Sequence, residues 1–445
     1  MSALLTEQSI YATQFSEIVD RLPGRGLDWL GRLRTSAIAR FVQLGFPTTR
    51  LEDWKYTNVA PIGRLTFRPA LSRSKASVPD FLRSQLDLFS GPRLVFVDGM
   101  LDRELSLNQD DDCGLQLSSL TGSLSNSNQA SALEGHLGRY ADTSNHAFVG
   151  WNTGFFTDGA YVVIPAGTSV LRPVHLVFIS AGADQPVAAY PRNLIVVAEG
   201  ARVAVAETFL SVPGEVHLTN AVTEIVAGAN ATIDYYKIER ESSDSFHVAT
   251  VKASLGRDAT LTSHTFSLGA ALTRNDLSVV LNGEGSRCSL HGLFLVEGHR
   301  LVDNHTEIDH RKPHATSREL YKGILSGHAQ GVFNGAIIVR EDAQKTDAVQ
   351  HSKNLLLSEH AQINTKPQLE IRADDVRCAH GASIGELDQE AMFYLKTRGL
   401  NEPAARQILI RGFAAEFLDQ VHIPDIRRHL ETLIDEWFEN RLEAA

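Results

Sequence analysis

The sequence contains few cysteines, few aromatic residues and no excess of basic residues, and each shortage excludes a class of protein. Its three cysteines, Cys113, Cys288 and Cys378, stand too far apart for a disulfide framework or a Cys-x-x-Cys zinc site. Aromatic residues make up 7% of the chain, too few to favour a sugar-binding groove lined with rings. With 42 Lys and Arg against 53 Asp and Glu, the net charge of -11 gives no attraction to nucleic acid or to an anionic membrane. Thiol chemistry must therefore rest on single cysteines.

Long apolar runs and export signals are also lacking. No stretch of 18 or more apolar residues could span a bilayer, and the first residues, Met-Ser-Ala-Leu-Leu-Thr-Glu-Gln, lack the basic start and apolar run of a secretory signal. The GxSxG, P-loop, HExxH and strand-following GxGxxG motifs are missing. No motif therefore supports the familiar classes of hydrolase, nucleotide-binding protein or protease. We therefore expect a cytoplasmic protein that binds neither nucleic acid nor a membrane.

What the sequence does contain is a series of glycine turns at regular spacing. Turns begin at Gly200, Gly228 and Gly256, 28 residues apart, and each is followed by small or branched apolar residues three and five positions later. Two further turns, Ser326-Gly-His-Ala-Gln and Ser358-Glu-His-Ala-Gln, recur 32 residues apart. Short strand-like runs fill the intervals, which predicts a mainly β fold, a parallel β-helix whose coils hydrogen-bond to one another. A large antiparallel sandwich is the alternative.

Helical periodicity is confined to the two ends of the chain. Apolar positions recur at helical spacing between about residues 6 and 44, while the Ser- and Asn-rich stretch 105–132 indicates a loop or poorly ordered linker. We expect three regions: residues 1–150 with helices, linker and first strands, residues 151–385 as the β-helix, and residues 386–445 as a C-terminal helical domain. The C-terminal helices either plug the open end of the solenoid or form a docking platform for a partner.

Cys378 and His380 are the first candidates for chemistry. They stand two apart in Val376-Arg-Cys-Ala-His-Gly-Ala-Ser-Ile-Gly, so on a strand their side chains would share a face. A neighbouring histidine or arginine favours the thiolate, and thiolate with imidazole is a partial ligand set for iron, zinc or copper. Two ligands do not hold a metal, so the rest must come from elsewhere or from another chain. From the residues alone, a structural cysteine beside an incidental histidine is the preferred interpretation.

Two acidic segments offer alternatives. Alternation along a strand would place His305, Glu307 and Asp309 on one face, either as a metal site or as a polar row along the outside of the solenoid. The carboxylates of Glu370, Asp374 and Asp375 crowd one stretch, and paired carboxylates occur in β-helix enzymes that cleave sugars. Such an enzyme is the main catalytic alternative, and a purely structural interaction protein is the other.

Several longer motifs occur together in this sequence. They read Gly45-Phe-Pro-Thr-Thr-Arg-Leu-Glu-Asp-Trp-Lys-Tyr-Thr, Asn304-His-Thr-Glu-Ile-Asp-His, Ser317-Arg-Glu-Leu-Tyr-Lys, Thr365-Lys-Pro-Gln-Leu-Glu-Ile and Ala373-Asp-Asp-Val-Arg-Cys-Ala-His-Gly-Ala. Together they resemble the SufD branch of the SufB/SufD family, the scaffold subunits of the SUF iron-sulfur cluster assembly system. The resemblance covers most of the chain except the stretches near residues 64–90 and 105–135.

The resemblance implies a right-handed parallel β-helix between helical ends, without enzymatic activity of its own. It implies a heterodimer with SufB through the β-helix, and binding of the ATPase SufC through the C-terminal helices. Tyr394, Arg398, Gly399 and Phe413 are the candidate SufC contacts. A homodimer is the alternative assembly of the isolated chain.

The resemblance also assigns Cys378 and His380 a role. The pair matches the family's functional residues, which implies that they contribute ligands to a transient iron-sulfur cluster or iron shared with SufB; Cys378 alternatively supports the interface. SufB-like chains carry a sulfur-accepting cysteine in the segment that corresponds to His351-Ser-Lys-Asn, so a sulfur donor is expected to act through SufB. An aid to iron acquisition and the participation of reduced flavin are left open.

Overall fold

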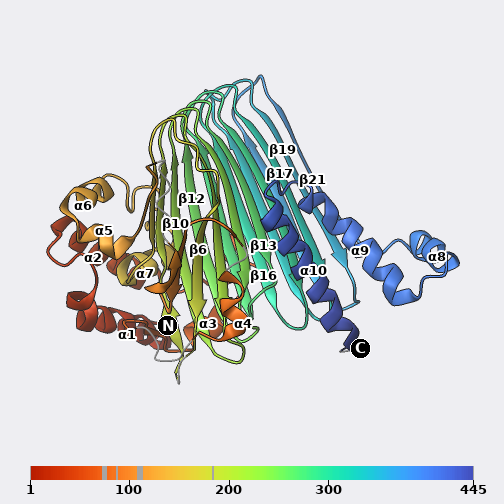
Figure 1. Cartoon of the computed structure of the whole chain (residues 1–445), viewed down its shortest axis with the longest axis horizontal. Coiled ribbons are helices and arrows are strands. Elements are labelled where there is room, and N and C mark those ends of the chain that lie inside the picture. Colours follow the sequence, from red (N-terminus) through yellow and green to blue (C-terminus); the bar gives the residue numbers. More distant parts are fainter. Residues whose placement is uncertain (1, 73–77, 87–88, 108–113, 183–184, 444–445) are drawn as a thin grey trace.

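Two long sheets of mostly parallel strands wind together into a β-solenoid, with helices at both ends of the chain (Figure 1). The structure, a computed structural model, describes residues 2–72, 78–86, 89–107, 114–182 and 185–443. Cys113 and part of the expected linker lie outside the described residues. Among the described helices, none is long and apolar enough to cross a membrane.

From β8 to β21, successive strands alternate between the two sheets, so each of these coils gives one strand to each sheet. Within the described residues, sheet A has 11 strands and sheet B has 10. Sheet A contains β1 (Arg68–Pro69), β4 (Gln116–Ser119), β5 (Ala160–Ile164), β7 (Val187–Ala189), β8 (Arg192–Val197), β10 (His217–Ala227), β12 (Phe246–Leu255), β14 (Leu272–Leu281), β16 (Leu301–His310), β18 (Gln330–Val339) and β20 (Gln362–Ile371). Sheet B contains β2 (Arg93–Val97), β3 (Met100–Leu107), β6 (Val174–Ser180), β9 (Arg202–Ser211), β11 (Thr232–Arg240), β13 (Thr260–Ser267), β15 (Arg287–Val296), β17 (Thr316–Leu325), β19 (Asp347–Leu356) and β21 (Arg377–Gly385).

Apolar rows running along the solenoid axis hold the coils together. Val279, Ile308, Ile337 and Leu369 are register partners on four successive strands of sheet A, and the first three are fully buried. Burying such a branched side chain contributes about 1.5–3 kcal/mol, so each added coil extends a continuous core. The strands of the solenoid pair in parallel, which confirms the β-helix and shows that the sandwich alternative is wrong.

The N-terminal helices gather beside the first coils (Figure 1). They are α1 (Ser2–Ile18), η1 (Val19–Arg21), α2 (Asp28–Leu44), η2 (Glu52–Trp54), α3 (Ala60–Gly63), α4 (Asp80–Arg83), α5 (Leu120–Leu124), α6 (Ser127–Glu134) and α7 (Ala147–Phe155). Helix α7 is buried along its whole length, with Trp151 stacked on Phe41 of α2 at 5.3 Å between ring centroids. This aromatic cluster joins the helices to the solenoid wall.

The prediction of a loop or linker over 105–132 is wrong for the described part of that stretch. Strand β4 and helices α5 and α6 occupy it. The Ser and Asn residues that indicated disorder act as helix caps: Ser119 Oγ accepts from the Gly122 N–H at 3.1 Å, and Asn126 Oδ1 accepts from two backbone N–H groups of α6. The apolar side chains Leu120 and Leu133 then pack into the N-terminal core.

A buried ion pair fastens the N-terminal region to sheet A. Arg192 Nη2 on β8 lies 2.7 Å from Glu224 Oε2 on β10, and both side chains are fully buried. Arg192 also donates to Thr153 Oγ1 of α7, while the Glu224 carboxylate accepts from backbone N–H groups, including those of Gly138 and Tyr140. One charge pair thus ties α7, the loop before it and two coils together.

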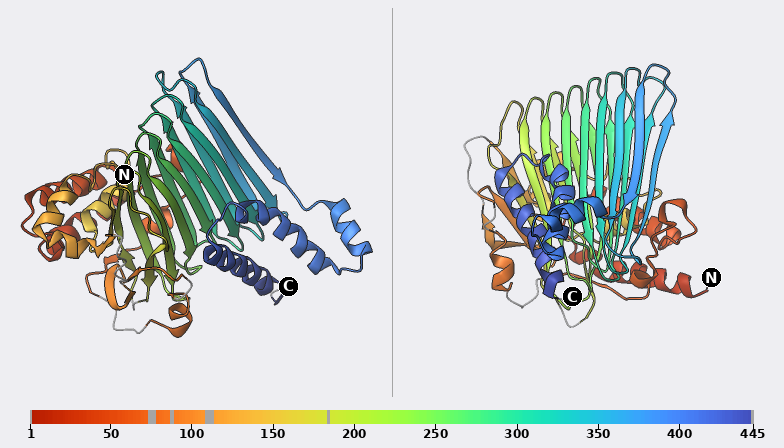
Figure 2. Two further views of the ribbon diagram at one scale, coloured as in Figure 1. Left: turned by 45° about the horizontal axis from the view of Figure 1, so that its top comes forward. Right: turned by 90° about the vertical axis from the view of Figure 1, so that its right-hand side faces the viewer.

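The C-terminal helices α8 (Gln389–Thr397), α9 (Glu402–Leu418) and α10 (Pro424–Glu443) do not cover the end of the solenoid. Helices α9 and α10 lie against the outer face of sheet B, and Phe417 and Leu430 pack there with Phe266 and Leu293 (Figure 2). The suggestion that these helices plug the open end is therefore wrong. In the described part of the chain, β20 and β21 each have a strand neighbour on one side only.

Candidate functional site

Cys378 and His380 lie on β21, the last strand of sheet B, at the open end of the solenoid. Their register partners on β19 are Ala348 and Gln350, which are fully buried in the interior. Because register partners share a face of a sheet, both side chains point toward the interior at its open rim. Cys378 is half-buried against the core, and His380 is exposed. The predicted sharing of one face is thus borne out.

The electrostatics of Cys378 differ from the expectation. Partial burial raises the pKa of the Cys378 thiol, a hydrogen bond with the Ala348 backbone partly offsets this, and the charge of Asp347 raises it further. In the isolated chain, burial and the neighbouring carboxylate therefore oppose the thiolate, which a nearby histidine or arginine was expected to favour. Coordination to a metal ion would lower this pKa, because a metal-bound thiol gives up its proton.

Beneath His380 a column of polar residues runs into the solenoid. Gln350 and Glu319 follow His380 in register on the next two strands, and both are buried. Gln350 Nε2 donates to Glu319 Oε2 at 2.6 Å. Burial raises the pKa of Glu319 to about 7, although hydrogen bonds from Gln350 and Thr306 oppose the shift. The sequence contained Glu319 within a quoted motif, but only the register between coils places this acid below His380.

The raised pKa of Glu319 predicts a pH-dependent effect of Glu319→Gln. The folded chain holds this proton more tightly than the unfolded chain, so the stabilisation is full at low pH and is lost as the pH rises through 7. The glutamine amide imitates the protonated acid at every pH. The variant should match the unaltered chain near pH 4 and exceed its free energy of unfolding by up to about 3 kcal/mol near pH 8.

Denaturant unfolding at the two pH values measures this difference. Glu284→Gln, a change on an exposed turn, is the control and should alter neither value. An equal shift for Glu319→Gln at both pH values would show that the carboxyl titrates normally.

The four candidate contacts for an ATPase differ in exposure. Tyr394 on α8 and Arg398, which directly follows this helix, are exposed, and Arg398 Nη2 donates to the Tyr394 hydroxyl at 3.0 Å. Gly399, at φ 91°, follows the end of that helix. Phe413 on α9 is half-buried instead, with the Lys322 ammonium 4.1 Å from its ring centroid. Of the four candidate contacts, the exposed ones therefore lie on α8 or directly after it.

His305, Glu307 and Asp309 fall on one outer face of β16, as alternation predicted, but they serve separate contacts. His305 Nε2 lies 3.1 Å from Asp303 Oδ1, and Glu307 accepts from Ser278 Oγ at 2.9 Å. Asp309 accepts from Arg311 and Arg340. The polar-row interpretation therefore fits better than the metal site. The carboxylates of Glu370, Asp374 and Asp375 are exposed, and Asp375 pairs with Lys345, so their placement gives no support to sugar cleavage.

Among the described residues, three metal-ligating side chains converge inside the solenoid: Glu239, Glu241 and His247. His247 Nδ1 lies 2.5 Å from Glu241, and Thr273 Oγ1 donates to Glu239 at 2.5 Å. Burial alone would raise the pKa of Glu241, but His247 and His217 hold it far below the ordinary range. Ion pairs and hydrogen bonds already occupy these carboxylates, so the cluster acts as an internal charge network.

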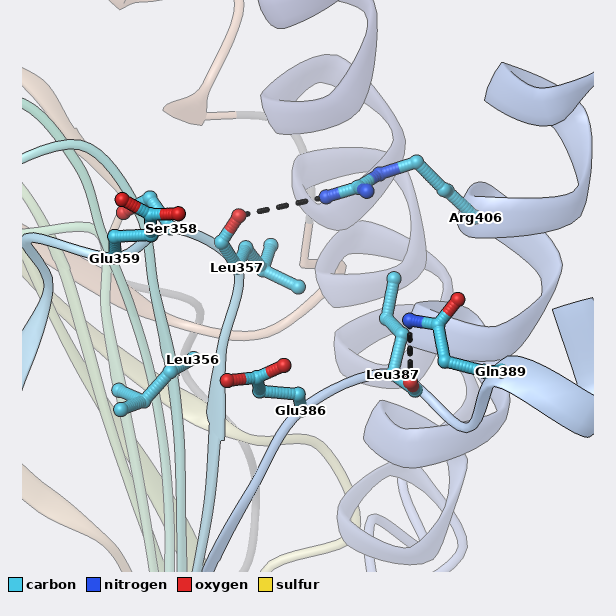
Figure 3. Close-up of a pocket in the computed structure, with 8 residues that line it drawn as sticks. All are labelled: Leu356, Leu357, Ser358, Glu359, Glu386, Leu387, Gln389 and Arg406. Atoms are coloured by element: carbon cyan, nitrogen blue, oxygen red, sulfur yellow. Dashed lines mark hydrogen bonds between the residues drawn. The ribbon is translucent and has the colours of Figure 1, made fainter.

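A cleft of about 160 Å³ opens where the solenoid meets the C-terminal helices (Figure 3). Figure 3 shows Glu359 of the β19–β20 turn and Glu386 of the β21–α8 linker on its solenoid side. Arg406 of α9 reaches across and donates to the Leu357 carbonyl at 3.5 Å. The cleft therefore lies where the linker after β21 and helix α9 meet the β19–β20 turn.

Known proteins with similar sequences agree with this architecture. A family model described as SUF system FeS cluster assembly, SufBD core domain, matches residues 178–413, and the SufBD protein N-terminal region matches residues 6–176. An iron-sulfur cluster assembly SufBD family protein of Synechocystis is 33% identical over 444 residues, covering 98% of this chain and 94% of the relative. The iron-sulfur cluster assembly protein SufD of Escherichia coli is 32% identical over 395 residues, 88% and 89% of the two chains. SufD of Bacillus subtilis is 25% identical over 415 residues, 92% and 93%.

Proposed function

The chain belongs to the SufBD family of SUF-system iron-sulfur cluster assembly proteins, and from this premise we propose that it is a non-catalytic scaffold subunit of the SufD type. In this proposal it works in the cytoplasm with a SufB-type partner and a SufC-type ATPase. The observation that carries the proposal is the half ligand set, Cys378 and His380, on a strand edge without a neighbour among the described strands.

The open edges support pairing with a similar solenoid. Strands β20 and β21 leave backbone N–H and C=O groups without a strand partner in the described chain, and such edges are templates for another chain. Ile371 and Ile384, one on each strand, are exposed at 44% and 51% and add apolar area there. A SufB-type partner would continue both sheets, and a second copy of this chain is the alternative for the isolated protein.

The rim of the solenoid supports a shared cluster site. Thiolate and imidazole are both good ligands for iron, and the partner would supply the donors that this chain lacks. Because the pKa of Cys378 is raised, binding of iron must expel the thiol proton, which couples thiolate formation to the arrival of the metal. His380, exposed at the rim, would be the first contact, and Cys378 a second ligand or a support of the seam.

The placement of the other residues favours sulfur delivery through the partner. Cys288 is fully buried, and burial raises the pKa of its thiol well above the ordinary range. The segment at 351–354 offers no thiol, and its Ser352 and Asn354 side chains are buried in the interior. A sulfur donor would therefore act on the SufB-type subunit, with this chain completing the site at the seam.

The C-terminal helices supply a route by which ATP hydrolysis could act on the seam. Glu416 of α9 binds both Lys322 of β17 and Lys353 of β19, at 2.6 and 2.8 Å. Strand β19 in turn pairs with β21. A SufC-type ATPase bound to α8 would move α9 and, through these contacts, open or close the seam.

Anaerobic co-expression with SufB-type and SufC-type partners tests the proposal. The expected result is a ternary complex whose absorption spectrum carries the bands of an iron-sulfur cluster. A chain that purifies alone, or a complex that stays colourless, would contradict it. Reconstitution with and without reduced flavin, and with free Fe²⁺ as the only iron source, tests whether the subunit needs a flavin or aids iron acquisition.

Docking of the ATPase predicts a strong effect of two changes on α8. Phe393 and Tyr394 are exposed at 69% and 55%, so glutamates there should not disturb the core but should repel an apolar partner surface. The double variant Phe393→Glu and Tyr394→Glu should stop the ATPase from co-purifying. Leu171→Glu, at a side chain exposed at 92% near the first coils, is the matched control and should leave binding intact.

Co-purification that persists in the α8 variant would place the ATPase elsewhere. These point changes test the docking of the ATPase more specifically than removal of the chain from Asn401 onward. That deletion would also uncover the apolar outer face of sheet B, which α9 and α10 bury.

A further inference from the structure

Three histidines occupy the same position in three successive turns of the solenoid. His299 lies between β15 and β16, His328 between β17 and β18, and His360 between β19 and β20. The ring centroids of His299 and His328 are 4.8 Å apart with planes 6° from parallel, and those of His328 and His360 are 4.7 Å apart at 8°. All three side chains are exposed. These three residues are called the histidine ladder.

The solenoid itself pre-arranges the ladder. Neighbouring strands stand about 4.7–4.9 Å apart, so equivalent residues of successive turns lie on top of one another. The three turns also share a backbone contact between the first and fourth residues, for example from the Ala329 N–H to the Ser326 carbonyl and from the Ala361 N–H to the Ser358 carbonyl, both 3.3 Å. The imidazoles are therefore held side by side before any ligand arrives.

The ladder nitrogens have no other assigned use. Within the described residues, none of the three imidazoles takes part in a recorded hydrogen bond or ion pair, whereas His264, also stacked, bonds to the Gln420 carbonyl. Glu359 precedes His360, at the position that Gly298 and Gly327 hold in the other two turns. A carboxylate, visible in Figure 3, thus stands at the end of the ladder nearest the last coil.

We propose that the histidine ladder binds a divalent transition-metal ion between two neighbouring imidazoles. A nitrogen-metal bond measures about 2.0–2.1 Å, so two nitrogens that share an ion stand at most about 4.2 Å apart. Rings stacked in parallel hold their nitrogen lone pairs in separate planes, so two neighbouring imidazoles must tilt toward each other to share an ion. Their exposure on adjacent turns leaves room for this movement. His299 and His360 are two steps apart, so His328 belongs to both pairs. Water molecules fill the remaining coordination positions of the ion. At the His360 end of the ladder, the Glu359 carboxylate fills one of them.

This site is separate from the rim that holds Cys378 and His380. The ladder follows the carboxyl ends of β15, β17 and β19, whereas Cys378 pairs with Ala348 near the start of β19. Most of the length of a strand lies between them. The inference therefore does not rest on the scaffold proposal, and Cys378 and His380 can be altered without touching the ladder.

Zinc titration of the untagged full-length chain by calorimetry tests the ladder. The measurement uses a His380→Ala background, so that the rim does not contribute. His328→Gln removes both pairs and should weaken Zn²⁺ binding by at least about tenfold, as expected for loss of a ligand. His299→Gln and His360→Gln each leave one pair and should retain most of the affinity. His314→Asn, at a histidine on the β16–β17 turn, is the matched control.

The same titration with Fe²⁺ under anaerobic conditions tests the ion relevant to cluster assembly. Circular dichroism confirms that each variant keeps the β-solenoid, as expected for changes on exposed turns. Equal Zn²⁺ affinity in His328→Gln and the parent, or no Zn²⁺ binding to the parent, would overturn the proposal and leave the ladder as a stacking contact only.

Discussion

Replacement of His380 with alanine is expected to abolish cluster formation in the reconstituted complex of this chain with its SufB-type and SufC-type partners. The imidazole is exposed at the open rim, so its loss removes a ligand without opening a cavity in the core. The thiol of Cys378 is half-buried and its pKa is raised, so it is a weaker first ligand for iron than the exposed imidazole. Absorbance of the cluster during anaerobic reconstitution measures the yield.

His351→Ala is the matched control for this experiment. His351 is also exposed, and it lies on the neighbouring strand β19 opposite Gly381, but it faces the outside of the solenoid. Its loss should leave the cluster yield unchanged. Unaltered yield in His380→Ala, with the complex still assembled, would remove His380 from the site and leave the edge as a docking surface alone.

Replacement of Glu224 with alanine is expected to cause the largest loss of stability among these changes, about 3–5 kcal/mol. The change leaves the fully buried guanidinium of Arg192 without its counter-ion. It also leaves the backbone N–H groups of Gly138, Tyr140 and Ala141 without their acceptor. Denaturant unfolding followed by tryptophan fluorescence measures the loss, since Trp151 lies on the helix that Arg192 anchors.

Two further variants define the cause. Glu224→Gln keeps an acceptor oxygen but removes the charge, so it should lose less than Glu224→Ala. Glu284→Ala, on an exposed turn, should leave the unfolding transition where it is. Similar values for Glu224→Ala and Glu284→Ala would mean that the buried pair does not hold the N-terminal helices to the solenoid.

The fold could be predicted from the sequence because its signals are local and repeated. The turns at Gly200, Gly228 and Gly256 precede β9, β11 and β13, so the recurrence of the turns reported the coils. The interval of 28 residues equals the coil length only between β11 and β13, because Thr232 pairs with Thr260, whereas Arg202 of β9 pairs with Thr232 at 30 residues. The prediction of a loop or linker over 105–132 was wrong because the signal there was only one of composition. Its Ser and Asn residues favour loops by composition, yet Ser119 and Asn126 cap helices whose few leucines are held by a core formed elsewhere.

The candidate site was only half predictable. A spacing of two residues placed Cys378 and His380 on one face, since strand alternation is a property of neighbouring residues. The direction of the thiol pKa was not predictable, because it depends on how far Cys378 is desolvated by packing against other coils. Neither the column of Gln350 and Glu319 nor the cluster around Glu241 left a signal in the sequence, as their members come from different strands.

The sequence by itself determined that the chain is a β-helix with helical ends and that a thiol and an imidazole stand together on its last strand. Period, turn residues and side-chain alternation are short-range properties that the chain carries wherever it folds. Only the tertiary structure decided that α9 and α10 cover the side of sheet B and leave the end open, and that His299, His328 and His360 form a ladder. Those relations depend on the register between coils and on which apolar face each helix finds, and both are fixed only when distant segments pack.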